Sequence, residues 1–350
     1  MAVEHGNRVA GHDVRAALQA CTTAAPAWAE RSSAERAGVL RVAAAWLEED
    51  HVGAELCAAA LGAEVGEILP HLRGCRELVE SRLPPPESAE GIVVLHLEWT
   101  ELARGILLRA VDALGAGRAV LLFSDPRLPL VADRVALALE HGGLPAGAFA
   151  VVHGAGDDAL ATALDVPAVR ALVASGTQRR IEALRRLAES REGDGEVVLE
   201  LEVPVNATVE VEAGVDVGGV AAEIVDGAFG RARTLSGQLP GRLGLVQCDP
   251  RVLPELTAAL LAALDENDDV QDPIPLIDRE AVREIQAVWR LGLDEGATLI
   301  AGGDAMGSTA GERRVLSTVF TNVEPGMQLA DTLAPGPLLC LLRGPEPEQP

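Results

Sequence analysis

The architecture of this chain can be read from residues 91–123, GIVVLHLEWTELARGILLRAVDALGAGRAVLLF. Gly91–Leu97 and Ala119–Phe123 are short apolar runs that are typical of buried strands. Thr100–Leu114, which lies between them, has the apolar spacing of a helix. Because a strand, a helix and a second strand follow in this order, the stretch predicts two parallel strands joined by a helical crossover.

The same alternation continues to about residue 203. We expect further strands at Phe149–His153, Val169–Ala174 and Val197–Val203, and helices at Pro129–His141, Ala159–Leu164 and Thr177–Arg191. Strands that alternate regularly with helices predict a parallel sheet with both faces covered. The sequence therefore predicts a doubly wound, Rossmann-like α/β domain over residues 1–203.

A second α/β domain is predicted over residues 204–343. Its expected helices are Val217–Phe229, Arg251–Asp265 and Arg279–Leu291, and its expected strands are Leu243–Val246, Thr298–Ile300, Val315–Val323 and Leu338–Leu342. Before the first domain's strands, Ser32-Ser33 predicts the start of an amphipathic helix. The Pro- and Glu-rich tail, residues 344–350, is expected to be disordered.

Composition excludes several classes of function. The chain has 350 residues, of which 29 are basic, all of them Arg, and 53 are acidic, for a net charge of −24. Such acidity argues against nucleic acid or an anionic membrane surface as a partner. No apolar run approaches the roughly 20 residues that span a bilayer, and the polar N-terminus does not resemble a signal peptide, so we expect a cytoplasmic protein. The five scattered cysteines predict neither a disulfide framework nor a metal site.

Several short strings follow one another in a fixed order along nearly the whole chain. They are Ala25–Trp28, Ser33–Arg36, Trp99, Gly142–Gly154, Leu199–Leu201, Glu212–Asp216, Gly296–Gly303 and Thr318–Pro337. In this order they resemble the aldehyde dehydrogenase superfamily, in which Trp99 would stand for the Trp of a Pro-Trp-Asn-Phe-Pro segment. No single string is specific, but their order is.

The resemblance implies a reaction in which a cysteine thiolate attacks an aldehyde, bound nicotinamide accepts hydride and a glutamate activates water. The family's nucleophile lies in a Gly-Gln-x-Cys string ahead of an Arg and a strand. Here the string is Ser236-Gly237-Gln238-Leu239-Pro240-Gly241-Arg242. Anchoring on Gly-Gln puts Pro240 at the nucleophile position, and anchoring on Arg242 puts Gly237 there. Neither carries a nucleophilic side chain, and Cys248 is expected beyond the following strand as an ordinary semi-buried thiol.

The other catalytic positions implied by the resemblance are also altered. Glu200 stands at the general-base position, but without an acyl-enzyme to hydrolyse we expect it to be a relic. Trp99-Thr100 replaces Trp-Asn, which substitutes a hydroxyl for the amide donor of the oxyanion hole. Phe123–Pro126 stands where the family holds the adenosine ribose with Lys-Pro-Ser-Glu, and Leu333 where a Glu grips the nicotinamide ribose.

The strongest binding feature is Ala174-Ser175-Gly176-Thr177, which resembles the family's Phe-Thr-Gly-Ser between a strand and a helix. A helix N-terminus there can hold a pyrophosphate, so Gly176 and Thr177 are the cofactor-binding candidates, with Trp99 a weaker one. Arg179 and Arg180 follow and add positive charge. The alternative interpretation is a capped helix start with a solvated Arg face. We expect no bound cofactor, and NAD or NADP if any binding is retained.

Compared with the family, the chain starts late and stops soon after Pro335–Pro337, as in the second module of two-module members. We therefore expect a truncated catalytic-type domain with an uncovered surface. The interpretation is a pseudoenzyme, a non-catalytic subunit or scaffold whose partner is a full-length aldehyde dehydrogenase or a second copy in a homo-oligomer. Two alternatives stay open: a divergent NAD(P)-dependent oxidoreductase acting on an aldehyde or oxo group, and a nucleotide-binding sensor.

Overall fold

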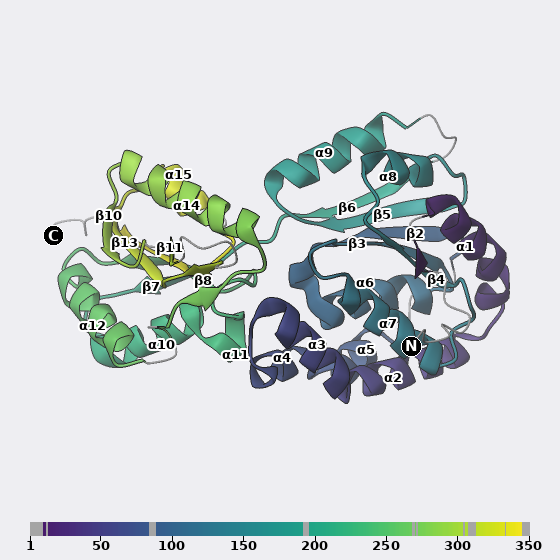
Figure 1. Ribbon diagram of the computed structural model, residues 1–350, viewed down its shortest axis with the longest axis horizontal. Coiled ribbons are helices and arrows are strands. Elements are labelled where there is room, and N and C mark those ends of the chain that lie inside the picture. Colours follow the sequence, from purple (N-terminus) through teal and green to yellow (C-terminus); the bar gives the residue numbers. More distant parts are fainter. Residues whose placement is uncertain are drawn as a thin grey trace. The chain divides into compact units, whose positions relative to one another are not determined.

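The structure is a computed structural model that describes residues 10–11, 13–83, 89–191, 196–267, 270, 272–303, 305–306, 313–332 and 334–344 (Figure 1). The chain forms two compact units, Met1–Cys57 with His71–Val203, and Ala58–Pro70 with Pro204–Pro350. Residues 58–70 are thus the part in which the observed units differ from the predicted ranges 1–203 and 204–343. Leu333 and residues 345–350 of the predicted tail lie outside the described residues.

The first unit is built on a six-stranded parallel sheet of order β1-β4-β3-β2-β5-β6. The strands are β1 (Ala10–Gly11), β2 (Ile92–His96), β3 (Ala119–Ser124), β4 (Phe149–His153), β5 (Val169–Ser175) and β6 (Val198–Glu202). β2, β3 and β4 are buried at every position except the last. Strands covered on both faces are apolar without alternation, so the runs seen in the sequence are explained. The predicted doubly wound fold is confirmed.

Helices cover both faces of this sheet (Figure 1). On one face lie α1 (Val14–Ala29), α8 (Asp157–Leu164) and α9 (Gln178–Glu189), whose apolar side chains form one core cluster with the strands. On the other lie α6 (Leu102–Gly115) and α7 (Pro129–His141), with α2 (Ser33–Glu48) and α5 (Cys75–Arg82) packed against them. Between α2 and α5 the chain forms α3 (His51–Leu61) and α4 (Val65–Leu72).

Capping residues fix where the first two helices begin. The predicted start of α2 is confirmed: Ser32 Oγ accepts from the Glu35 N–H at 3.3 Å, and the Glu35 carboxylate accepts from the Ser32 N–H at 2.9 Å. This reciprocal arrangement satisfies two backbone donors that a helix start leaves open. Helix α1, which is capped by Asp13, was not predicted from the sequence.

The second unit contains a five-stranded sheet of order β10-β13-β14-β8-β7 and a three-stranded sheet of order β11-β12-β9. The strands are β7 (Ala207–Val211), β8 (Leu243–Cys248), β9 (Ile274–Pro275), β10 (Thr298–Ala301), β11 (Ala305–Met306), β12 (Arg314–Val315), β13 (Thr318–Val323) and β14 (Leu338–Arg343). The helices are α10 (Val217–Phe229), α11 (Arg231–Thr234), α12 (Leu253–Asp265), α14 (Arg279–Asp294) and α15 (Gln328–Asp331). In the larger sheet β10 runs antiparallel to β13, and the other pairs are parallel.

Three predictions, two about secondary structure and one about a cysteine, are corrected by the structure. The strand predicted at Val315–Val323 is two strands, because β12 pairs with β9 and β11 whereas β13 pairs with β10 and β14. The helix predicted from Thr100 begins with a 3-10 turn, Trp99–Glu101, before α6. Cys248, expected beyond its strand, is the last residue of β8 and is fully buried. No helix within the described ranges combines the length and apolarity needed to cross a membrane.

Candidate functional site

The strand order of the first unit places a topological switch point between β2 and β5. β2 leads into the 3-10 turn and α6 on one face of the sheet, whereas β5 leads into α9 on the other. In open parallel sheets the loops diverge at such a point, and ligands bind at the carboxyl ends of the two strands. Trp99 follows β2, and Gly176 and Thr177 follow β5, so all three cofactor-binding candidates lie in these two loops.

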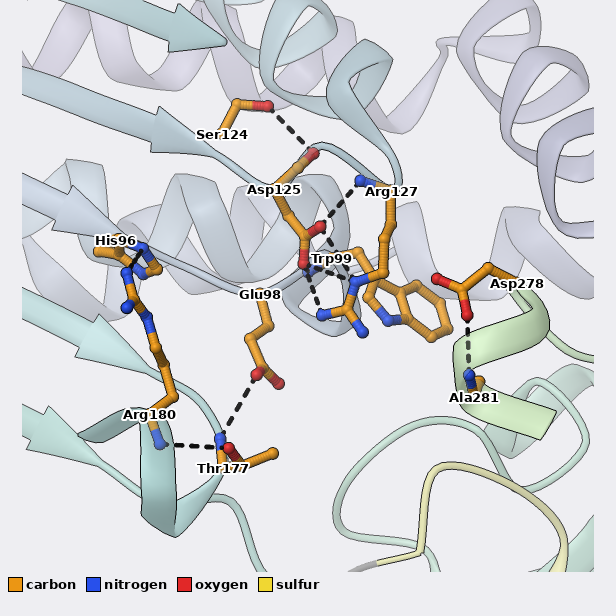
Figure 2. A network of polar contacts seen from close by, with 10 residues as sticks. All are labelled: His96, Glu98, Trp99, Ser124, Asp125, Arg127, Thr177, Arg180, Asp278 and Ala281. Atoms are coloured by element: carbon orange, nitrogen blue, oxygen red, sulfur yellow. Dashed lines mark hydrogen bonds and ion pairs between the residues drawn. The ribbon is translucent and has the colours of Figure 1, made fainter. Parts of the chain in front are cut away.

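A carboxylate already lies at the N-terminus of α9. Glu98 Oε1 accepts a hydrogen bond from the Thr177 N–H at 3.3 Å, and Figure 2 shows this side chain reaching from the β2 loop to the start of α9. The same oxygen would be 3.1 Å from a Cβ placed on Gly176. The position that a pyrophosphate would take at this helix N-terminus therefore faces an internal negative charge.

Other loop amides at this helix start are also engaged. The Gly176 N–H donates to the Glu202 carbonyl at 3.2 Å, and the Arg180 N–H donates to Thr177 Oγ1 at 3.3 Å. Thr177 is thus the N-cap of α9. This part of the loop agrees with the alternative that the sequence left open, a capped helix start.

Arg180 turns back toward the sheet instead of extending into solvent. Its Nη2 lies 2.8 Å from His96 Nε2 (Figure 2). Its Nη1 lies 2.7 Å from Asp157 Oδ1. Burial, reinforced by the charge of Arg180, lowers the pKa of His96 to about 4. The imidazole is therefore neutral near pH 7 and accepts the hydrogen bond from the guanidinium.

A second carboxylate ties the β2 loop to the loop after β3. Asp125 Oδ2 accepts from the Trp99 N–H at 3.0 Å and forms an ion pair with Arg127 Nη2 at 2.7 Å (Figure 2). Burial raises the pKa of Asp125, but the hydrogen bonds and charge of Arg127 outweigh it and hold the pKa below its ordinary value. Asp125 lies in the segment aligned with the family's ribose contacts, and here its contacts are within the protein.

Glu200 lies on the exposed face of β6. This strand alternates exposed and half-buried residues, with Glu200 and Glu202 on the exposed face. Glu202 forms an ion pair with Arg109 of α6, whose guanidinium also lies 3.8 Å from Glu101. Burial lowers the pKa of Arg109, but the Glu202 hydrogen bond and the three nearby carboxylates raise it overall. Glu200 is thus part of an acidic strand end that a neighbouring Arg partly neutralises.

The loop aligned with the nucleophile belongs to the second unit and follows α11. Leu235 and Ser236 have left-handed backbone, with φ of 47° and 55°, and Gly237 continues it with φ of 78°. A Cβ on Gly237 would lie 2.8 Å from Pro337 Cα and 3.1 Å from the Ala228 carbonyl oxygen. Both neighbours are backbone atoms, so this position accommodates no side chain without a shift of the main chain.

The residue after this glycine, Gln238, holds the loop in place through hydrogen bonds. Gln238 is buried, its Nε2 donates to the Leu235 and Pro275 carbonyls at 3.1 Å each, and its Oε1 accepts from the Ile277 N–H at 3.0 Å. Pro240 lies half-buried in the turn that follows and carries no nucleophile. The Gly-Gln string thus has a packing role here that does not depend on a catalytic thiol.

Arg242 and the cysteines complete the description of this region. Arg242 is 3% exposed and donates to the Leu338 carbonyl, and burial lowers its pKa to about 10. The five cysteines are buried, and burial raises the pKa of each thiol, in four of them to about 12. Because the thiolate is the nucleophile, none of these cysteines is activated. Among the described residues, no group of three or more His, Cys, Asp or Glu side chains is placed to hold a metal ion.

Sequence reasoning missed the residue that most constrains the switch point. Trp99, Gly176 and Thr177 were singled out, whereas Glu98 was not. The available signal was position: Glu98 directly precedes Trp99, where the Pro-Trp-Asn-Phe-Pro segment has proline. A carboxylate in place of a proline at the end of a central strand predicts a new polar contact.

Comparison with curated proteins gives relatives that are named as semialdehyde dehydrogenases. The 2-hydroxymuconic semialdehyde dehydrogenase of Pseudomonas sp. (strain CF600) is 24% identical over 264 residues, which cover 73% of this chain and 52% of the relative. Malonate-semialdehyde dehydrogenase 2 of Bacillus mycoides (strain KBAB4) is 28% identical over 239 residues, which cover 66% of this chain and 47% of the relative. The chain thus spans about half the length of the curated relatives it matches.

Solved structures of similar fold cover most of the chain. One is a NAD-dependent benzaldehyde dehydrogenase from Corynebacterium glutamicum, with a TM-score of 0.79, 23% identity, and coverage of 95% of this chain and 76% of that one. Another is an NADP-dependent glyceraldehyde-3-phosphate dehydrogenase from Bacillus halodurans C-125, with a TM-score of 0.77, 22% identity, and coverage of 94% and 73%. These likenesses show the fold, and residues 104–349 match the sequence family itself. The chain belongs to the aldehyde dehydrogenase family.

Proposed function

We propose that this chain is a non-catalytic member of the family that acts as a subunit or scaffold for a full-length aldehyde dehydrogenase. The observation that carries the proposal is the nucleophile loop. Gly237 has backbone atoms of Pro337 and Ala228 where a side chain would start, and Pro240 has no group that attacks a carbonyl. Losing an activated nucleophile costs several powers of ten in rate.

The cysteines support the same proposal. Cys248 is the cysteine nearest in sequence to this loop, and it is the last residue of a strand paired on both sides, by β7 and β14. Its Sγ lies 3.5 Å from the Asp249 carbonyl oxygen, and burial raises its pKa. A buried neutral thiol does not form a thiohemiacetal with an aldehyde at a useful rate.

The similar solved structures are named as NAD- or NADP-dependent, and they give no support to the expectation that this chain binds no cofactor. The residues at the switch point do not fit a dinucleotide as they stand. Glu98 presents a carboxylate where the pyrophosphate would bind, and the Gly176 and Thr177 amides already donate to the Glu202 carbonyl and to Glu98. Two anions in one place repel each other. We therefore assign no step of a reaction to a nicotinamide cofactor.

A divergent NAD(P)-dependent oxidoreductase acting on an aldehyde or oxo group is the second candidate. It is favoured by the names of the relatives, which are aldehyde-oxidising enzymes. In this alternative water would add to the aldehyde in place of a thiol, the hydrate would give up hydride to the nicotinamide, and Glu200 would be available to accept the proton that leaves as the acid forms. The two candidates differ in one measurable property, aldehyde-dependent formation of NADH or NADPH.

The test uses the purified chain with NAD or NADP and a panel of aldehydes that includes semialdehydes. We expect the rate to equal that of heat-inactivated protein. A higher rate that disappears in Glu200→Gln would refute the non-catalytic assignment and identify the activity as this chain's own. A higher rate that Glu200→Gln leaves unchanged would point to a contaminating enzyme and would agree with the proposal.

The partner is tested separately by pull-down from the source cell followed by native mass spectrometry. We expect a complex with a full-length family member or, as the second possibility, a homo-oligomer. A lone monomer at cellular concentration would contradict the subunit role.

A further inference from the structure

We propose that the Glu98 carboxylate takes the place of a ligand phosphate at the switch point. The chain thereby fills, with its own side chain, the anion-binding site that its fold would otherwise offer. The inference deepens the proposed non-catalytic function, on which it rests, because it gives a physical reason why a member of this family would not hold a dinucleotide. It concerns one contact between two loops of the first unit, and that contact can be removed by one substitution.

The Glu98 carboxylate lies where a helix N-terminus attracts anions. Backbone N–H groups at a helix N-terminus, together with the helix dipole, attract negative charge. α9 has 12 residues, long enough for this effect, and Glu98 Oε1 meets it at the Thr177 N–H. A Cβ added to Gly176 would lie only 3.1 Å from the same oxygen. Glu98 thus has the place and the charge of a bound phosphate oxygen.

The guanidinium of Arg180 is already paired within the protein. In an open anion site Arg180, in the first turn of α9, would be available to a phosphate. Here its guanidinium is 2.7 Å from Asp157 and 2.8 Å from His96 (Figure 2). Both the helix start and its neighbouring Arg are therefore satisfied by the protein itself, which removes the attraction that would draw a pyrophosphate.

The loop after β2, which carries Glu98, is also bound to the loop after β3. The Trp99 N–H is bound by Asp125, which is in turn bound by Arg127. Glu98, adjacent to Trp99, is therefore presented to α9 by a fixed loop.

The experiment is a calorimetric titration of the full chain with inorganic pyrophosphate, and then with NAD, at low ionic strength. Glu98→Gln removes the charge and keeps the shape, and Glu98→Ala also vacates the space. Glu90→Gln is the matched control, because Glu90 is an exposed glutamate near the opposite end of β2. Since like charges in one site oppose binding strongly, we expect both Glu98 variants to bind pyrophosphate about tenfold or more tightly than the wild type, and the control to equal the wild type.

Equal affinities in the wild type and both Glu98 variants would overturn the inference, whether all bind or none does. A gain in the Glu90→Gln control as well would also overturn it, because the effect would then come from net charge alone. Circular dichroism melting identifies a variant that does not fold, and the other Glu98 variant then decides. Wild-type aldehyde oxidation together with tighter pyrophosphate binding in Glu98→Gln would refute the non-catalytic function while keeping the present inference.

Discussion

Replacing Gly237 by alanine tests whether the nucleophile loop has room for any side chain. The added methyl group would meet Pro337 Cα at 2.8 Å and the Ala228 carbonyl oxygen at 3.1 Å, on a backbone with φ of +78°. Gly241, four residues later, has the same φ of +78° and nothing within 4 Å of a built Cβ. The pair therefore separates the effect of backbone strain, present in both variants, from that of steric overlap, present only at Gly237.

The expected magnitudes follow from these two effects. A left-handed backbone costs a residue with a Cβ about 1–2 kcal/mol, so G241A should lower the free energy of unfolding by that amount. Overpacking against atoms that cannot move aside adds about 1–3 kcal/mol, so G237A should be less stable than G241A by this difference. For a unit of this size each kcal/mol lowers the melting temperature by about 2–4 °C.

Differential scanning calorimetry of the wild type, G237A and G241A measures these shifts directly. Equal melting temperatures for the two variants would show that the loop relaxes around a side chain, and the steric argument against a nucleophile at Gly237 would then be wrong. The same logic applies to G237C, which we expect to restore no aldehyde oxidation. Aldehyde-dependent NADH formation by G237C would contradict the steric argument.

Three further predictions concern burial and charge. Because every thiol is buried, alkylation of the folded chain should be slow, whereas in denaturant all five thiols should react. A cysteine that mass spectrometry found rapidly labelled in the folded chain would contradict this prediction. Burial lowers the pKa of His96 to about 4, whereas in the unfolded chain this imidazole takes up its proton below about pH 6.5. The free energy of unfolding should therefore decrease as the pH falls from about 6.5 to about 4. H96Q should weaken this pH dependence, whereas the same substitution at exposed His51 should not, and parallel curves for the two variants would refute the prediction. Asp50 and Arg134 form a largely buried ion pair, with side chains 4% and 18% exposed. In urea unfolding D50N should lower the free energy of unfolding by about 3 kcal/mol, more than E80Q, the corresponding change at exposed Glu80. Equal losses in the two variants would show that the pair is not buried in solution.

Much of the first unit could be predicted from sequence because its signals are local. The helix Pro129–His141 and the strand Phe149–His153 agree with the structure at both ends. Proline at the first helical position and Gly142-Gly143 after the last one mark the helix boundaries. The strand is a continuous apolar run because it is covered on both faces. Elements with such boundaries need no knowledge of their neighbours.

The missed elements lack these signals. The strand β7 lies at the edge of its sheet and is mostly exposed, so its residues, Ala207–Val211, form no apolar run. Two-residue strands such as β9 exist only through pairing with distant segments, here β12. Register between such segments is set by tertiary contacts that a local pattern does not contain.

The candidate site shows the same limit more sharply. The position of Gly176 and Thr177 at the end of β5 could be predicted, because a Gly-Thr pair between a strand and a helix is a local signal. The carboxylate that faces them comes from Glu98, which is 79 residues away from Thr177 in sequence. The contact between these two loops is visible only in the structure, where the Thr177 N–H at the start of α9 already donates to Glu98.

The Gly-Gln string shows why a motif can be present without the chemistry for which it is known. Gln238 bridges three backbone groups, the Leu235 and Pro275 carbonyls and the Ile277 N–H, and loss of the amide would remove all three hydrogen bonds, with the Leu235 carbonyl keeping the Gln238 N–H as a donor. Buried polar groups without partners cost about 1–3 kcal/mol each, so the glutamine has a structural reason to be there that is independent of a thiol. The resemblance in this string is therefore evidence for the fold of the loop and carries no weight for catalysis. The proposed non-catalytic function rests instead on Gly237 and Glu98, which belong to different units and concern two different requirements of the family's reaction, a nucleophile and a bound cofactor.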